Sequence, residues 1–207
     1  MTRYILHGGG YVFGLKAQKF FDDFVHGMGD EEGKLLYIPF AEGEIEDTLE
    51  FIGQEAQAYR IAQTAQFLTN KKFSFECAYP LKEVFTEQLE RATHVFFAGG
   101  TTMLLVHIME RYLDGGMEEI GQYLENKTVV GLSAGANALC KLCYGLDAHR
   151  VLRCNGPCDA SVIVHWGQYG GYRPEQWDEV EKVMNKERKG LPLLKLRSNE
   201  WKVIEQP

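Results

Sequence analysis

The chain has 207 residues, enough for one domain with its own hydrophobic core. Hydrophobic residues make up 45% of the sequence, yet no window approaches 18 consecutive apolar residues, so no membrane span is expected. The formal net charge of −7 argues against a nucleic-acid partner, because phosphate binding needs clustered lysine and arginine.

Short apolar runs alternate with longer amphipathic runs along the chain. The patterns predict strands at residues 3–9, 34–41, 73–79, 93–100, 128–132, 159–167 and 200–205. They predict helices at residues 16–28, 46–68, 81–92, 101–116, 117–127, 134–143 and 173–187. This alternation indicates an α/β fold, a single-domain sandwich over residues 1–207 with helices flanking a mostly parallel central sheet. The first apolar run is too short for a signal peptide and is interpreted as the first strand.

The five cysteines raise the question of a metal site. Their odd number and the absence of a signal peptide favour a reducing, cytoplasmic environment. Cys140-x-x-Cys143 followed by Cys154-x-x-x-Cys158 is similar to a four-thiolate zinc pattern. The first pair, however, falls in the helix expected after residue 133, where cysteines three apart usually face a core. Buried reduced thiols are therefore favoured over zinc.

The stretch "GLSAG" places Ser133 between two glycines, at the junction of an expected strand and an expected helix. A serine nucleophile has to protrude from the backbone, and a sharp strand-to-helix turn achieves this when glycines lie two positions to either side. This context predicts that Ser133 is a nucleophile. The alternative is a serine that only caps the start of the helix.

A second glycine-rich junction, "FFAGGTTMLL", occurs about thirty residues earlier. Acyl transfer needs two donors for its oxyanion. We expect the amide of Ala134 to be one donor and an amide of Gly99 or Gly100 to be the other. The alternative is that these glycines only form a tight loop.

A serine nucleophile also needs a base, and the chain has six histidines. His165 closes the apolar run "ASVIVHWG" and is expected at the end of a strand, where it could meet Ser133. His165 is therefore the favoured general base, against the alternative of a structural histidine. His149 is the reserve candidate, and His7, at the end of the first strand, could line the pocket instead.

The runs "GLSAGANAL" and "FFAGGTTMLL", followed by a histidine at a strand end, resemble dipeptidase E (alpha-aspartyl dipeptidase) and its relative cyanophycinase. The resemblance implies a serine peptidase on the class I glutamine amidotransferase-like, flavodoxin-like fold. It matches Ser133 to the nucleophile and His165 to the family histidine, although the residues beside that histidine differ from the family pattern. It also matches Gly99, Gly100 and the amide of Ala134 to the oxyanion hole.

Several family positions are occupied differently here. Thr101 stands where the family has an asparagine and is expected to contact the substrate. Arg173 resembles an arginine linked to binding a substrate carboxylate. The glutamate of the family's C-terminal stretch is replaced by Ser198 in "KLRSNEW", with Glu200 two residues later. Asp147 resembles another family acid. The resemblance implies Asp147, or else Glu200, as the acid that orients the histidine.

These observations predict a serine hydrolase that cleaves small peptides, with an N-terminal acidic residue as the implied preference, and that needs no metal or organic cofactor. The second hypothesis is a catalytically silent relative that binds a small molecule or a partner through the same pocket. A glutamine amidotransferase is disfavoured, because that chemistry uses a cysteine where this chain has Ser133. The sequence leaves the oligomeric state open.

Overall fold

The computed structural model describes residues 1–14, 16–29, 32–43 and 48–207, with residues 48–51 described by their backbone only. The helix expected at 46–68 is seen from Thr48 to Thr69, and its expected first two residues, 46 and 47, lie outside the described residues.

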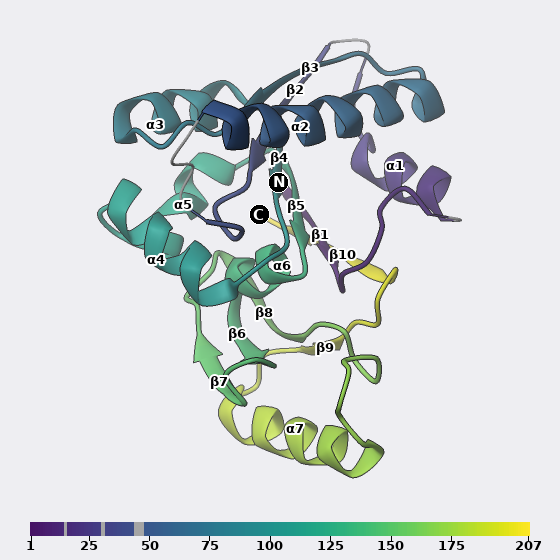
Figure 1. The fold of residues 1–207 in the computed structure, drawn as a ribbon, viewed down its shortest axis with the longest axis vertical. Coiled ribbons are helices and arrows are strands. Elements are labelled where there is room, and N and C mark those ends of the chain that lie inside the picture. The colour runs from purple at the N-terminus through teal and green to yellow at the C-terminus, as the bar shows by residue number, and fades with distance from the viewer. Residues whose placement is uncertain (15, 30–31, 44–47) are drawn as a thin grey trace.

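A six-stranded sheet forms the centre of the molecule, in the order β10-β1-β5-β4-β2-β3 (Figure 1). Every neighbouring pair is parallel except β1 and β10, which are antiparallel. The strands are β1 (Thr2–His7), β2 (Gly33–Ile38), β3 (Phe73–Cys77), β4 (His94–Phe97), β5 (Thr128–Leu132) and β10 (Trp201–Gln206). The predicted α/β fold with a mostly parallel sheet is confirmed.

Helices cover both faces of this sheet. The side chains of strand β4 illustrate this, because they pack into a different buried cluster on each face. Val95 and Phe97 belong to one buried cluster, whereas Phe96 belongs to another, because successive side chains of a strand point to opposite faces. The first cluster contains side chains of α3 (Lys82–Arg91), α4 (Thr102–Tyr112), α5 (Gly116–Leu124) and α6 (Ala134–Leu139). The second contains side chains of α1 (Ala17–Phe24) and α2 (Thr48–Thr69).

A second sheet of four strands has the order β7-β6-β8-β9. It consists of β6 (Cys140–Gly145), β7 (Arg150–Arg153), β8 (Cys158–Ile163) and β9 (Leu193–Lys195). Strand β6 is parallel to β8 and antiparallel to β7. Helix α7 (Pro174–Glu187) packs on this sheet through Trp177, Val180 and Met184, at the end of the molecule away from α2 and α3 (Figure 1).

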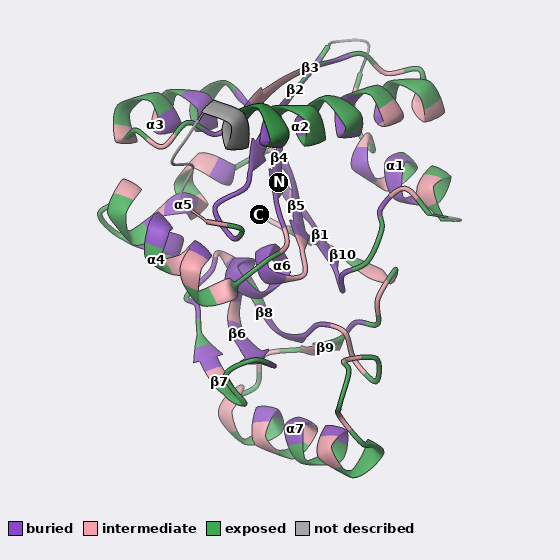
Figure 2. Cartoon of the chain, in the orientation of Figure 1, coloured by how far each residue is buried: buried purple, intermediate pink, exposed green. Residues whose placement is uncertain are grey.

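The second sheet corrects one expectation. The helix predicted over 134–143 ends at Leu139, and Cys140 begins β6. The segment from Cys140 becomes a strand because it pairs with β7 and β8, and such long-range pairing overrides a local helical pattern. Helix α6 is consequently short, and it is buried along its whole length (Figure 2).

The cysteines of the proposed zinc pattern are free thiols buried in this region. The Sγ atoms of Cys143 and Cys154 lie 3.6 Å apart. Within the described ranges, no group of three or more histidine, cysteine or acidic side chains is arranged to hold a metal ion. None of the helices in the described part of the chain is both long enough and apolar enough to cross a membrane.

Candidate active site

Ser133 occupies the sharp turn between β5 and α6. Its backbone has φ 50° and ψ −105°, a region that non-glycine residues rarely adopt, which costs about 1–3 kcal/mol. The Ser133 amide donates a hydrogen bond of 2.9 Å to the carbonyl of His7 at the end of β1, which helps to hold the turn. The hydroxyl makes no capping bond to α6, so the interpretation of Ser133 as only a helix cap is wrong.

The two flanking glycines are required because α6 packs directly against the strands. A Cβ added to Gly131 would lie 2.6 Å from the backbone nitrogen of Ala136. A Cβ added to Gly135 would lie 2.5 Å from the carbonyl oxygen of Phe97. Both distances are too short for any side chain, so these positions need glycine to bring the start of the helix against β4 and β5.

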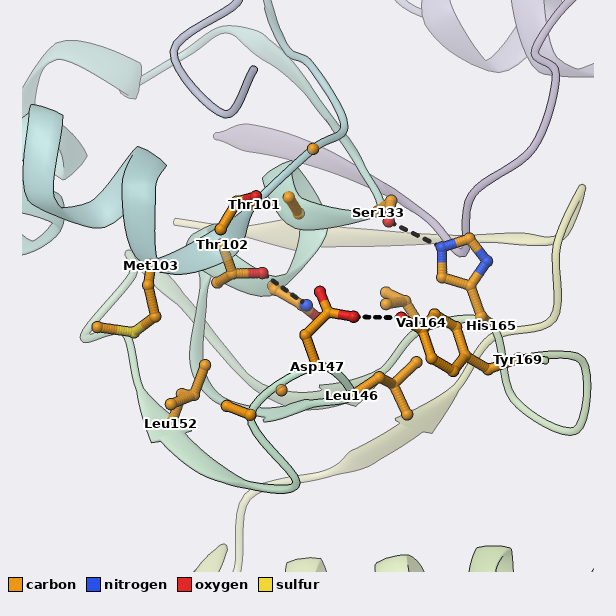
Figure 3. A pocket seen from close by; sticks show the side chains of 15 residues that line it. Thr101, Thr102, Met103, Ser133, Leu146, Asp147, Leu152, Val164, His165 and Tyr169 are labelled. Carbon is orange, nitrogen blue, oxygen red and sulfur yellow. Dashed lines mark hydrogen bonds between the residues drawn. The ribbon is translucent and has the colours of Figure 1, made fainter. Parts of the chain in front are cut away.

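His165 supplies the partner of the serine hydroxyl. Its Nε2 lies 2.9 Å from the Oγ of Ser133, within a hydrogen bond (Figure 3). His165 does not end the strand as expected: β8 stops at Ile163, and the histidine stands in the following turn with φ 53°. Its amide donates to the carbonyl of Gly8, 3.0 Å away, so the loop after β1 fixes the backbone of the histidine.

The imidazole also packs closely on Gly9. A Cβ added at this position would lie 2.0 Å from Cε1 of His165, and Gly9 itself has φ 105°, where glycine is strongly favoured. Nearby, the buried ring of His7 accepts a hydrogen bond of 3.2 Å from the Gly9 amide through Nδ1. His7 therefore supports the loop beneath the imidazole, and it does not line the cavity as the sequence had suggested.

The second ring nitrogen of His165 has an unexpected partner. Its Nδ1 lies 3.1 Å from the Oγ of Ser198, on the segment before β10. Neither expected acid holds this nitrogen. The carboxylate of Asp147 accepts a hydrogen bond from the hydroxyl of Tyr169, and that of Glu200 accepts one of 3.2 Å from the amide of Arg197. The orienting group in this structure is therefore the neutral hydroxyl of Ser198.

Burial and charge act on His165 in opposite directions. Desolvation lowers the pKa of His165 below its ordinary value of 6.5, and the negative charge of Asp147 opposes this by raising it. The imidazole is accordingly neutral near pH 7, the form that can accept a proton from a hydroxyl. Burial also lowers the pKa of His7, to about 4, so the neighbouring ring stays uncharged as well.

Ser133 and His165 open into a cavity of about 280 Å³ (Figure 3). Its walls include the junction at the start of α4, helix α6 and the loop after β6, which contribute Thr101, Thr102, Asn137 and Asp147. This volume lies just below the range that is usual for ligand pockets. No lysine or arginine is among the described residues that line it.

The glycine loop after β4 lies against the serine. A Cβ built on Gly99 would be 3.6 Å from the Cβ of Ser133. The amides on either side of the glycine pair are occupied, since Ala98 donates to Ile38 and Thr101 donates to Ala41. Among the backbone hydrogen bonds of the described residues, none uses the amide of Gly99 or Gly100. Their role as oxyanion donors, together with the amide of Ala134, stays a prediction.

Two further candidates lie away from the cavity. Arg173 is exposed at the N-terminus of α7 and is not among the cavity-lining residues. His149 is exposed, and its Nδ1 is hydrogen-bonded to the hydroxyl of Tyr172 at 2.5 Å, so it is not the partner of Ser133.

Sequence reasoning missed the roles of Asn137, Tyr169 and Ser198 at this site. A signal existed for two of them, because Asn137 belongs to the run "SAGAN" and Ser198 stands at the position of the family's glutamate.

Comparisons with known proteins agree with this geometry. The model of peptidase family S51 matches residues 5–153. No curated protein matches the sequence. A solved peptidase from an acI-B1 Actinobacterium is 20% identical, with a TM-score of 0.63, and the match covers 100% of this chain and 88% of that one. A protein described as peptidase E from Listeria monocytogenes EGD-e is 15% identical, with a TM-score of 0.59, and both chains are covered completely. At these identities the two structures show a shared fold.

Proposed function

Because the chain belongs to peptidase family S51, we propose that it is a serine peptidase that cleaves small peptides with Ser133 as nucleophile and His165 as base. The observation that carries the proposal is the 2.9 Å hydrogen bond between Oγ and Nε2 at a strained turn that opens into a cavity. A nucleophilic hydroxyl, a base in contact with it and a cavity for the substrate are three of the features that acyl transfer requires. The cavity of about 280 Å³ suits a short peptide.

The proposed reaction has two stages. The Oγ of Ser133 attacks the scissile carbonyl carbon while its proton passes to Nε2 of His165. The amide of Ala134 and an amide of Gly99 or Gly100 stabilise the oxyanion. Nε2 then gives the proton to the leaving amine, and an acyl-enzyme remains. Water activated by the same nitrogen attacks the acyl carbon and restores Ser133.

Ser198 defines the tautomer in this scheme. Nε2 has to be unprotonated to act as base, so Nδ1 carries the hydrogen and donates it to Oγ of Ser198. A hydroxyl fixes the ring but adds no full negative charge to stabilise the imidazolium that forms. The charge of Asp147, which raises the pKa of His165, supplies part of that stabilisation from the cavity wall.

The neutral Ser198 also favours the second candidate function, a binding protein without turnover. The two functions differ in whether Ser133 reacts. A fluorophosphonate probe tests this, because the serine oxygen displaces fluoride from phosphorus only when a base takes its proton. We expect labelling of the wild-type protein and none of Ser133→Ala. The matched control is Ser74→Ala, at an exposed serine remote from the cavity, which should label normally. An unlabelled wild-type protein would favour the binding function.

A further inference from the structure

We infer that the cavity selects peptides with a protonated amine beside the scissile bond and discriminates against an acidic first residue. This inference rests on the proposed peptidase function and names its substrate class. It reverses the preference that the resemblance to dipeptidase E implies. The amine has two possible sources in a peptide, the free α-ammonium group and the side chain of lysine.

The charge of the cavity is the first observation. Asp147 points into the cavity from the loop after β6 (Figure 3). The hydroxyl of Tyr169 bonds to Oδ1, which leaves Oδ2 as an acceptor. No described lysine or arginine lines the same walls, so this carboxylate has no cation there to neutralise it. A substrate carboxylate would meet a like charge, whereas an ammonium group would be attracted.

Asn137 provides the second, independent observation. Its side chain is buried and lines the cavity, and its Nδ2 donates a hydrogen bond of 3.0 Å to Oγ1 of Thr102. Its Oδ1 is buried and has no hydrogen-bond partner. A buried acceptor left unpaired is unfavourable, and a donor from a bound ligand would satisfy it after a small rotation of the Asn137 side chain toward the cavity. A protonated amine carries three N–H donors and no acceptor, which suits a wall built of carboxylate and carbonyl oxygens.

The position of Asp147 indicates that the protonated amine of the substrate binds near the scissile bond. Asp147 lines the same cavity as Ser133 and His165, and its negative charge acts on the pKa of His165. Because this cavity measures only about 280 Å³, a group bound by Asp147 lies near the acyl carbon that Ser133 attacks. The cation expected to bind a substrate carboxylate, Arg173, is exposed on α7 and is not part of the lining.

Five aminomethylcoumarin amides test the inference, those of alanine, N-acetylalanine, N-acetyllysine, N-acetylnorleucine and aspartate. Alanine against N-acetylalanine isolates the α-ammonium group, and N-acetyllysine against its neutral analogue norleucine isolates the side-chain amine. We expect kcat/KM to be at least about tenfold higher for the charged member of one pair, which identifies the source. Three of the five amides carry a free amine, namely those of alanine, N-acetyllysine and aspartate. Among these three, the aspartate amide should have the lowest kcat/KM. Equal rates within both pairs, or aspartate as the best substrate, would overturn the inference.

The variant Asp147→Asn tests whether the carboxylate causes the preference for the charged substrate. The ratio of kcat/KM within the responsive pair should fall toward one, because the neutral amide keeps the shape but loses the charge. Tyr169→Phe is the matched control, since it removes the hydrogen bond to Asp147 and keeps its charge, so the ratio should persist. An unchanged ratio in Asp147→Asn would overturn the inference even if that variant is less active. Fluorophosphonate labelling distinguishes a failure of this inference from a failure of the proposed function. If the probe labels the protein but the substrates show no charge preference, the peptidase proposal stands and only the inferred substrate class is wrong.

Discussion

The hydroxyl oxygen of Ser198 lies 3.1 Å from Nδ1 of His165, on the opposite side of the ring from Ser133. Three side chains thus form a line of serine, histidine and serine, supplied by the turn after β5, the turn after β8 and the segment before β10. A hydroxyl can accept the Nδ1 proton and hold the ring, but it offers no charge to the imidazolium.

Replacing Ser198 tests this arrangement. Ser198→Ala removes the acceptor for Nδ1, and the loss of one hydrogen bond should lower kcat by about tenfold. Ser198→Glu introduces a carboxylate at the family's position, which should stabilise the imidazolium, raise kcat above that of the alanine variant and raise the pKa of His165. Steady-state kinetics and pH profiles measure both effects. An alanine variant as active as the wild type would show that Ser198 does not orient the ring.

The pH dependence follows from the environment of His165. The neutral ring is the active form, and burial lowers its pKa below 6.5, so kcat/KM should stay high at pH 7 and decline only at lower pH. Asp147→Asn removes a charge that stabilises the imidazolium, which lowers the pKa further and moves the decline to still lower pH. N-acetylalanine aminomethylcoumarin suits the measurement, because the substrate has no titrating group. Asp178→Asn, at an exposed aspartate of α7, is the control, and a shift in the opposite direction for Asp147→Asn would contradict the assignment.

Gly9 tests the placement of the imidazole. Alanine there would put a Cβ 2.0 Å from Cε1 of His165, at a backbone φ of 105°. The ring would have to move, and a displacement of about 1 Å costs roughly 10²-fold in rate. We expect activity to fall by at least that factor while the protein stays folded. Gly14→Ala is the matched control in the same loop, because its added Cβ would meet nothing closer than 3.5 Å. Equal activities of the two variants would rule out this role for Gly9.

Gly135 tests the packing of the turn. Its added Cβ would lie 2.5 Å from the carbonyl oxygen of Phe97, and backbone on both sides limits relaxation. Gly135→Ala should lower the free energy of unfolding by about 1–3 kcal/mol, as overpacking of a core does. Urea denaturation followed by fluorescence gives this value. Gly170→Ala, where the added Cβ meets no atom within 4 Å, should leave the midpoint nearly unchanged. A stable Gly135→Ala variant would mean that α6 can shift away from β4.

The local pattern of apolar residues was sufficient to predict the strands of the central sheet. The apolar runs that end at His7 and Leu132 become β1 and β5 because each is buried on both sides and flanked by glycine or by a helix. The junction around Ser133 was recognisable for a similar reason, since the glycines, the strand and the helix that make the turn are contiguous in the sequence.

The pattern failed where structure depends on distant partners. Cys140 was expected in a helix but begins a strand, because β6 is defined by its pairing with β7 and β8. The short strands β7 and β9 carry too few residues for a periodic signal, and they form by addition to β6 and β8.

The sequence by itself determined the α/β class, the turn that presents Ser133 and the histidine that meets it, because these follow from contiguous apolar patterns and from glycine spacing. Only the tertiary structure decided which group holds the other side of His165 and which charges face the cavity. Ser198 is 33 residues from the histidine, and Asp147 affects the pKa of His165 only through spatial proximity. These contacts depend on how separate loops pack together at the edge of the sheet. The spacing of the residues along the chain does not predict that packing.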